Sequence, residues 1–247
     1  MTILKKEYRI VLPLTISEYN IGQLYTVAQM SKSESTGDTS IIILENKDDV
    51  HPVLGKCRKT VKIMNLGSKV PAIIRKCVSD KALSLTEEAY NAFPRCNTHY
   101  VNNYFSSEKF SVSVESVHEE GAALRNDVFG DAEAIVDFID IGGPAVDKRY
   151  DPSKHQNSRG PLGPEWIRRC QEKGIPLMTC YKKVTIQVNC FGLGWVTKEV
   201  DKQMRNIFLI SHQQLFCSMD DWINLSLQDI RDIEEQTKKE LESKVSK

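Results

Sequence analysis

The chain of 247 residues is long enough for one large domain or two small ones, and its 40% of hydrophobic residues can form a substantial core. Lys plus Arg and Asp plus Glu number 33 each, so the formal net charge is zero, which argues against a protein that binds nucleic acid through bulk charge. The seven cysteines include no Cys-x-x-Cys pair, so we expect neither a disulfide framework nor a metal site, as is usual for a cytoplasmic protein. No apolar stretch approaches the ~20 residues of a membrane span, so we expect no transmembrane helix.

The first part of the chain is expected to alternate strands with short helices. Residues 7–14 form a predicted strand, and residues 17–30 a helix whose apolar side chains share one face. The polar stretch at residues 31–40 predicts a loop. We then expect strands at residues 41–45 and 58–66, a helix at residues 70–77, and a helix that opens at the capping-box sequence Ser84-Leu-Thr-Glu87 and runs to Asn91.

The rest of the chain is expected to contain further strands and to end in long helices. The strands are predicted at residues 96–104, 110–118, 135–141 and 181–189. Apolar residues at helical intervals predict a helix over residues 197–222 and a second that begins near Ser226 and continues past Leu241. Without repeats or a clear linker, this order predicts a single α+β domain over residues 1–247, with an antiparallel sheet wrapped on a helix.

Several strand faces carry polar side chains among apolar ones. Because side chains alternate along a strand, Lys182 shares a face with Val184 and Ile186, and Thr60 shares one with Lys62. Two hydroxyl groups have similar positions, those of Thr98 and Ser116. One interpretation is a solvated strand face, from which lysine reaches water. The alternative is a cavity wall, on which the ammonium of Lys182 would bind an anion.

The last predicted helix carries a carboxylate within its apolar stripe. The stripe consists of residues at steps of three and four, namely Leu227, Ile230, Glu234, Thr237 and Leu241. A buried carboxylate is costly without hydrogen-bond donors. Glu234 is therefore either a residue at the edge of the stripe that pairs with a lysine, or an acceptor for a polyhydroxylated ligand.

A proline-rich string is more specific than these patterns. Residues 159–166 read Arg-Gly-Pro-Leu-Gly-Pro-Glu-Trp, which predicts an ordered turn followed by helical spacing from Trp166. The string resembles one in the phosphatidylinositol transfer proteins. Five more strings agree with that family in order and spacing, at residues 22–25, 68–71, 91–96, 214–217 and 229–237. The chain therefore resembles a single-domain member of this family from residue 6 to about residue 241.

The resemblance implies a START-like fold, in which a curved antiparallel sheet and long helices enclose a lipid cavity. It implies a monomeric carrier that exchanges one phosphatidylinositol or phosphatidylcholine molecule between membranes, without a cofactor and without enzymatic activity. The inositol contacts that carry over are Thr60, Lys62, Asn91 and Glu234. The phosphate contacts that carry over are Gln23, Thr98, Ser116 and Lys182, and Cys96 matches a thiol near the headgroup.

Some positions depart from the family pattern. At the membrane-docking loop, Cys190 and Phe191 stand where members resembling the animal proteins have a Trp-Trp pair, and Trp195 follows four residues on. Met204 replaces an acidic residue expected near the headgroup. The region between residues 151 and 159 is shorter, so the family's phosphorylatable serine does not carry over.

The resemblance also leaves the opening mechanism and two other functions to consider. We expect residues 69–83 and 226–243 to form the lid, with cations of the first segment near anionic headgroups. An enzyme with Cys96 and His99 as nucleophile and base is disfavoured, because alternation puts them on opposite faces of a strand. The other alternative is a lipid sensor that presents a phosphoinositide precursor to a partner enzyme.

Overall fold

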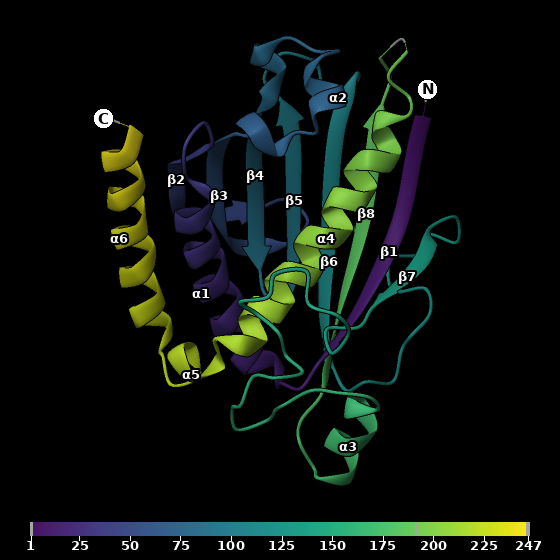
Figure 1. Ribbon diagram of the computed structural model, residues 1–247, viewed down its shortest axis with the longest axis vertical. Coiled ribbons are helices and arrows are strands. Elements are labelled where there is room, and N and C mark those ends of the chain that lie inside the picture. Colours follow the sequence, from purple (N-terminus) through teal and green to yellow (C-terminus); the bar gives the residue numbers. More distant parts are fainter. Residues whose placement is uncertain (1, 191, 246–247) are drawn as a thin grey trace.

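The computed structural model describes residues 2–190 and 192–245 and is an α+β structure built on one eight-stranded sheet (Figure 1). Its strands are β1 Thr2–Leu12, β2 Ser40–His51, β3 Gly55–Asn65, β4 Ser84–Ala92, β5 Arg95–Asn102, β6 Phe110–Glu120, β7 Ile135–Ile139 and β8 Met178–Val188. Their order across the sheet is β2-β3-β4-β5-β6-β8-β1-β7, and neighbours are antiparallel except β1 and β7, which are parallel. The α-helices are α1 Ile16–Glu34, α2 Ala72–Arg75, α3 Trp166–Glu172, α4 Val196–Cys217, α5 Met219–Trp222 and α6 Leu227–Val245.

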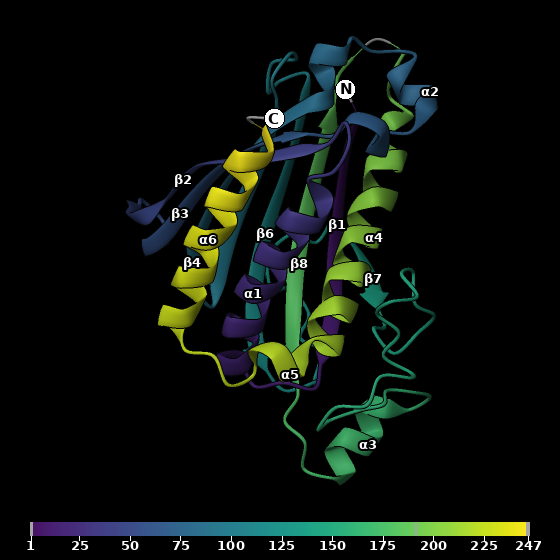
Figure 2. The ribbon, with the colours of Figure 1, turned by 60° about the vertical axis from the view of Figure 1, so that its left-hand side comes forward.

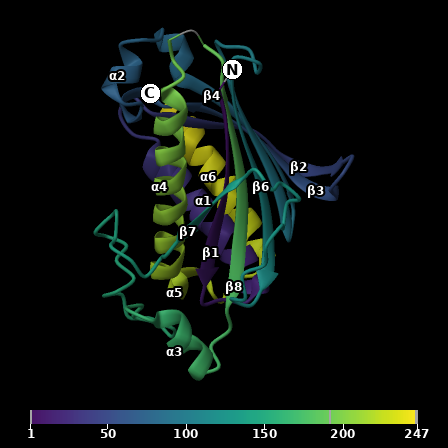
Figure 3. The same cartoon turned by 90° about the vertical axis from the view of Figure 1, so that its right-hand side faces the viewer.

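The three long helices lie on the same face of the sheet (Figures 2 and 3). Helix α4 contacts β8 and β1, α6 contacts β2, and α1 lies against both α4 and α6. This face is called the inner face below. Since a strand alternates its side chains, every second residue of each strand lies between the sheet and the helices.

The Arg-Gly-Pro turn fastens the start of α1. Thr15 and Glu18 form a capping box, in which Thr15 Oγ1 accepts from the Glu18 N–H and Glu18 Oε2 accepts from the Thr15 N–H. Arg159 donates to Glu18 Oε2 at 2.8 Å and to the Pro13 carbonyl at 2.7 Å. Although burial of the Glu18 carboxyl group acts in the opposite direction, the hydrogen bonds from Arg159 and Thr15 lower the pKa of this group. The string therefore anchors α1 over the sheet.

The helix predicted to open at Ser84 is wrong, because this segment is strand β4. Eight residues of β4 pair with β3 on one side and eight pair with β5 on the other. Two complete ladders outweigh a four-residue capping signature, which describes only a helix end. An ion pair of 2.7 Å between Lys59 and Glu88 adds a contact across β3 and β4.

Other boundaries also differ from the sequence predictions. Helix α1 continues to Glu34, so the loop predicted from residue 31 starts four residues later. The predicted helix at residues 70–77 is reduced to α2, which has four residues and no buried side chain that would stabilise a longer helix. The predicted helix over residues 197–222 is interrupted at Ser218, where α4 ends before α5 begins.

The space between the sheet and the helices is filled unevenly. Beneath α4 the inner face is densely packed, and Val114 and Val184 are 5% and 0% exposed. Across the same row of the sheet, Thr60, Ala89 and Thr98 are only half-buried although they also face the helices. The hydrophobic core thus lies under α4, and the more accessible part of the inner face lies on β3, β4 and β5.

Candidate functional site

The strand register places the predicted headgroup residues of the sheet in three adjacent rows of the inner face. The first row runs across β3, β4, β5, β6 and β8 through Arg58, Asn91, Cys96, Ser116 and Lys182. The second row runs through Thr60, Ala89, Thr98, Val114 and Val184. The third row runs through Lys62, Glu87, Tyr100, Val112 and Ile186. Residues spread over more than 120 positions of sequence are thus brought to one surface.

Lys182 carries a positive charge without a carboxylate partner. Its Nζ donates to Ser116 Oγ at 3.2 Å and lies 5.3 Å from the centre of the Phe208 ring, which belongs to α4. The other Lys and Arg side chains of the inner face that are not exposed are paired with carboxylates, as Lys6 with Asp201, Arg58 with Asp48 and Lys62 with Glu87. Within the described part of the chain, Lys182 has no such ion pair, so its charge is available to an anion.

His118 stays neutral beside Lys182. The ring is 2% exposed, and burial together with the nearby Lys182 charge lowers the pKa of His118 from 6.5 to about 3. Its Nδ1 donates to the Pro94 carbonyl at 2.8 Å, which leaves Nε2 as an acceptor. No partner for Nε2 occurs among the described residues, although the atom is buried. The neutral ring therefore adds no second positive charge to the site.

Cys96 is half-buried, and its thiol does not have the environment of a nucleophile. Burial raises the pKa of its thiol, although the Lys182 charge opposes this effect. Cys96 faces the helices, whereas His99 pairs with Glu88 and Ser113 on the outer face. The predicted separation of Cys96 from His99 is therefore confirmed.

Glu234 is held against the sheet by two donors. Its Oε2 accepts from Asn46 Nδ2 at 3.0 Å and from Arg231 Nη1 at 2.7 Å. Asn46 lies directly opposite Thr60 in the β2–β3 ladder and is itself bound by Arg58 Nε at 2.7 Å. Glu234 thus has a basic partner, as the alternative of an ion-paired residue expects, but this partner is Arg231 and not a lysine. The carboxylate lies over the row that contains Thr60.

Gln23 lies on the sheet-facing side of α1. The ring of Tyr19, one helical turn earlier, is 4.8 Å from the ring of His118 on β6. A helical turn advances ~5.4 Å, so Gln23 follows Tyr19 on the same face. Its amide donates to Asn20 Oδ1 at 3.5 Å. Helix α1 thus brings Gln23 over the sheet near the row that contains Ser116 and Lys182.

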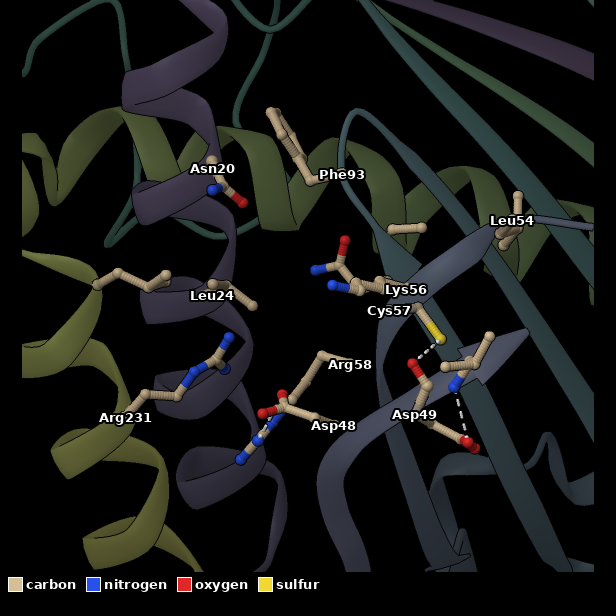
Figure 4. A pocket seen from close by; sticks show the side chains of 14 residues that line it. Asn20, Leu24, Asp48, Asp49, Leu54, Lys56, Cys57, Arg58, Phe93 and Arg231 are labelled. Carbon is tan, nitrogen blue, oxygen red and sulfur yellow. Dashed lines mark hydrogen bonds and ion pairs between the residues drawn. The ribbon is translucent and has the colours of Figure 1, made fainter.

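A cavity of about 740 Å³ opens between α1, α6 and the β2–β3 hairpin. Figure 4 shows that its lining includes Leu24 on α1, Arg231 on α6 and Arg58 on β3. Asn91 also lines it, and the buried Oδ1 of Asn91 has no hydrogen-bond partner among the described residues. A free buried acceptor at this position is suited to a ligand that donates a hydrogen bond.

Two of the predicted membrane-docking residues, Cys190 and Trp195, lie between the end of β8 and the start of α4. Figure 1 shows α2 and the start of α4 at one end of the molecule, away from α5. The side chains of Ile73 and Trp195 are 61% and 41% exposed. Cys190 is half-buried, and its thiol donates to the Lys109 carbonyl at 3.7 Å. Phe191 lies outside the described residues.

Two further positions show where expectation and structure differ. Met204 of α4, which was expected to remove a polar contact near the headgroup, is 9% exposed and belongs to the hydrophobic cluster between α4 and the sheet. Lys69 pairs with Glu34, whereas Arg75 and Lys76, the other two cations expected near anionic headgroups, are exposed and form no ion pair within the described part of the chain. Glu87, Tyr100 and His118 were missed by sequence reasoning. His118 could have been found because it shares a strand face with Ser116. Glu87 could not, because residues 84–91 were predicted to form a helix and so had no strand face.

Neither a metal nor a membrane span is indicated in the part of the chain that the structure describes. Its His, Cys, Asp and Glu side chains form no group of three or more that could hold a metal ion. Its helices are too short or too polar to cross a bilayer. The candidate site consists of the unpaired ammonium of Lys182, hydroxyl and amide groups, and the Glu234 carboxylate, which accepts from two donors.

Comparisons with known proteins agree along nearly the whole chain. The sequence model of the family described as phosphatidylinositol transfer protein matches residues 3–239. Phosphatidylinositol transfer protein 2 of Dictyostelium discoideum is 38% identical over 98% of this chain and 97% of its own length. The Homo sapiens protein named phosphatidylinositol transfer protein beta isoform is 37% identical over 98% of this chain and 94% of its own length. Membrane-associated phosphatidylinositol transfer protein 1 of Mus musculus is 33% identical over 99% of this chain, but this match covers 21% of that protein.

Proposed function

The chain belongs to the phosphatidylinositol transfer protein family, whose members carry lipids and are not enzymes, and on this basis we propose that it moves one phosphatidylinositol or phosphatidylcholine molecule between membranes. The observation that carries the proposal is the unpaired ammonium of Lys182 beneath the helices, 3.2 Å from Ser116 Oγ. A phosphodiester carries a single negative charge, so one buried ammonium matches it. Gln23 and Thr98 lie on the elements around this position and complete the phosphate contacts.

We assign the inositol ring to the part of the inner face formed by β3 and β4. Its hydroxyls accept hydrogen bonds from Lys62 and Thr60 and donate to Glu234 and to the free Oδ1 of Asn91. The half-buried state of these strands supports this assignment, because the side chains are covered by helices without being fully packed. Cys96, in the first row beside Asn91, lies near the headgroup.

The acyl chains require an apolar enclosure. A diacyl lipid exposes about 30 methylenes, each worth ~0.8 kcal/mol, so leaving a bilayer for water costs on the order of 25 kcal/mol. We assign the enclosure to a START-like cavity between the sheet and the helices. Residues 69–83 and 226–243 act as its lid, and the lack of any buried side chain in α2 fits a segment that moves.

Membrane contact is assigned to the end that contains α2 and the start of α4. Cys190, Phe191 and Trp195 form the docking segment, with Ile73 exposed at the same end. Exposed Arg75 and Lys76 attract anionic lipids. In this proposal the protein is a cytoplasmic monomer of one domain that visits membrane surfaces transiently and needs no cofactor.

Transfer between vesicles tests the role of Lys182. Lys182→Met should lose transfer of both lipids, because both share the phosphate, whereas Lys183→Met should transfer normally. Lys183 is a matched control, since it lies on the outer face and pairs with Glu115 at 2.8 Å. Normal transfer by Lys182→Met would contradict the proposal. A wild-type protein that binds one lipid but exchanges it slowly would indicate a sensor instead.

A further inference from the structure

The C-terminal end of α1 contacts both segments assigned to the lid. Helix α1 ends at Glu34, and residues 35–40 lead from it into β2. Residues 32–40 are called the α1 junction below. Within the junction, Thr39 Oγ1 donates to the Thr36 carbonyl at 2.7 Å. This internal hydrogen bond helps to give the junction a defined shape, to which other segments can attach.

The lid segment that contains α2 is attached to the junction by polar contacts. Asp38 accepts hydrogen bonds from the N–H and from Oγ of Ser68, both at 2.7 Å. The next residue, Lys69, forms an ion pair with Glu34. A Cβ atom at Gly67 would overlap the Asp38 carbonyl oxygen, so the backbones are in close contact. Since α2 has no buried side chain, these contacts are well placed to hold the segment in position.

Helix α6 is attached to the same junction near its last turn. Lys244 Nζ donates to the carbonyls of Lys32 and Ser35 at 3.0 and 3.3 Å. The Lys32 ammonium in turn forms an ion pair of 3.1 Å with Glu240. The last carbonyls of a helix lack partners within the helix and carry a partial negative charge, so an ammonium is favourable there. Lys244 therefore caps α1 although it belongs to α6.

Most of these contacts are accessible to water. The side chains of Lys69 and Glu34 are 45% and 40% exposed, and those of Lys32 and Glu240 are 23% and 41% exposed. A cavity of about 460 Å³ also lies between the junction and Leu241 of α6. Exposed ion pairs contribute little to stability and are weakened by competing ions. Such contacts can hold a lid closed and still break readily.

Both attachments lie at the end of the molecule assigned to membrane contact. Figures 1 and 3 show α2 and the C-terminal end of α6 toward the same end. The cations of the attachments, on Lys69 and Lys244, are thus close to the surface that meets lipid. An anionic membrane attracts a lysine about as strongly as an exposed ion pair holds it. A membrane surface can therefore compete with the junction for these two side chains.

We propose that the α1 junction is a common latch for both lid segments, and that an anionic membrane surface opens it by competing for Lys69 and Lys244. This inference rests on the proposed function, since it concerns the lid assigned there. A shared latch makes the two segments open together. It also restricts opening to the membrane surface, where a lipid can enter without exposing its acyl chains to water.

Hydrogen–deuterium exchange of the full chain tests whether the two lid segments are coupled. Asp38→Ala removes the acceptor of Ser68, and Lys244→Met removes the cap of α1. Each variant should accelerate exchange about fivefold in both segments, the lower end of typical coupling between two sites. Acceleration confined to the segment that contacts the substituted residue overturns the shared latch.

Two control variants test the role of the Lys244 charge. Lys244→Arg keeps a cation at this position and should exchange like the wild-type protein. Lys239→Met should also exchange like the wild-type protein, because Lys239 is 71% exposed and pairs with Glu235 of its own helix. Fast exchange of the lid segments in either control overturns the assignment of the latch to the Lys244 charge.

Vesicles test the trigger. Exchange is compared on phosphatidylcholine vesicles and on vesicles of phosphatidylcholine mixed with phosphatidylserine, at equal bound fractions of protein. The wild-type protein should exchange faster in both lid segments on the anionic vesicles. The double variant of Lys69→Met with Lys244→Met should exchange fast on both kinds of vesicle. Equal exchange of the wild-type protein on the two kinds of vesicle overturns the trigger.

The outcomes distinguish the latch from the function on which it rests, because transfer of phosphatidylinositol between vesicles is measured on the same preparations. Coupled exchange in both variants, together with transfer by the wild-type protein, supports the latch. Transfer by the wild-type protein without coupled exchange in the variants overturns the latch alone. A wild-type protein that transfers no phospholipid overturns the proposed function and the inference that rests on it.

Discussion

Glu234 Oε2 accepts a 3.0 Å hydrogen bond from Asn46 Nδ2, and this contact ties the last helix to the edge strand of the sheet. The two residues are 188 positions apart. The bond explains how a carboxylate is accommodated in the apolar stripe of α6, because Asn46 and Arg231 replace the water that it loses. It also places the carboxylate over the row that contains Thr60.

Replacing Glu234 should weaken both lipid binding and the attachment of α6. Glu234→Ala leaves Asn46 and Arg231 without their acceptor, which should cost about 1–3 kcal/mol of unfolding free energy. Amide exchange in α6 should accelerate, and phosphatidylinositol transfer should fall more than phosphatidylcholine transfer. Glu235→Ala is the control, because Glu235 is 61% exposed and pairs only loosely with Lys239. Equal stability of the two variants would contradict the contact.

The Arg159–Glu18 pair should matter more for stability than for lipid choice. Arg159→Ala removes donors to Glu18 and to the Pro13 carbonyl at the start of α1, so urea unfolding should show a loss of about 1–3 kcal/mol. The ratio of the two transferred lipids should not change. Arg168→Ala removes two mostly exposed pairs, with Glu165 and Glu172, and should cost less than ~1 kcal/mol. A loss in Arg168→Ala as large as that in Arg159→Ala would refute the anchoring role.

His118 should make stability depend on pH in the acidic range. The pKa of His118 is lowered to about 3 in the folded protein, from 6.5. Between these values the unfolded chain binds more protons, so the free energy of unfolding decreases as pH falls, by up to about 1.4 kcal/mol per pH unit. Urea unfolding from pH 7 to pH 4 should show a shallower dependence in His118→Gln.

The exposed His99 on the outer face provides the control for this pH effect. His99→Gln should leave the pH dependence as steep as in the wild-type protein. Parallel curves for wild type and His118→Gln would show that the buried ring does not stay neutral. Lys182→Met should raise the pKa of His118, because the Lys182 charge is one of its causes, and this shift can be followed by NMR.

Trp195 should contribute to membrane docking without holding the cargo. Trp195→Ala should reduce sedimentation with liposomes several-fold, because an aromatic ring is a favourable interfacial anchor, and the bound lipid should be retained. Ile207→Ala is the control, since Ile207 is 47% exposed on α4, the helix that Trp195 precedes. The docking role fails if Trp195→Ala sediments like the control. Phe191→Ala is expected to behave like Trp195→Ala.

The sequence was informative wherever side-chain alternation determined the outcome. Thr60, Lys62, Thr98, Ser116 and Lys182 were assigned to strand faces by period two, and the register confirms that they share the inner face. Which strands are neighbours could not be predicted, because pairing depends on contacts between distant segments. The rows themselves, and the ion pairs that leave Lys182 unpaired, follow from this pairing.

Because residues 84–91 were wrongly predicted to form a helix, the sequence did not reveal the partners of Glu87. As a helix this segment gives Glu87 no defined partner, whereas in strand β4 the same residue lies opposite Lys62 and Tyr100. Local sequence could not reveal this, since the stabilisation of β4 comes from ladders with β3 and β5. The partners of Glu234 were missed for a similar reason, because Asn46 belongs to an edge strand far away in the chain.

The central claim, that the inner face encloses one phospholipid, is tested most directly by native mass spectrometry of the purified protein. The account predicts a mass increase equal to one phosphatidylinositol or phosphatidylcholine per chain, lost on extraction with organic solvent and absent in Lys182→Met. A wild-type protein that carries no phospholipid and takes none from vesicles of either lipid would contradict it.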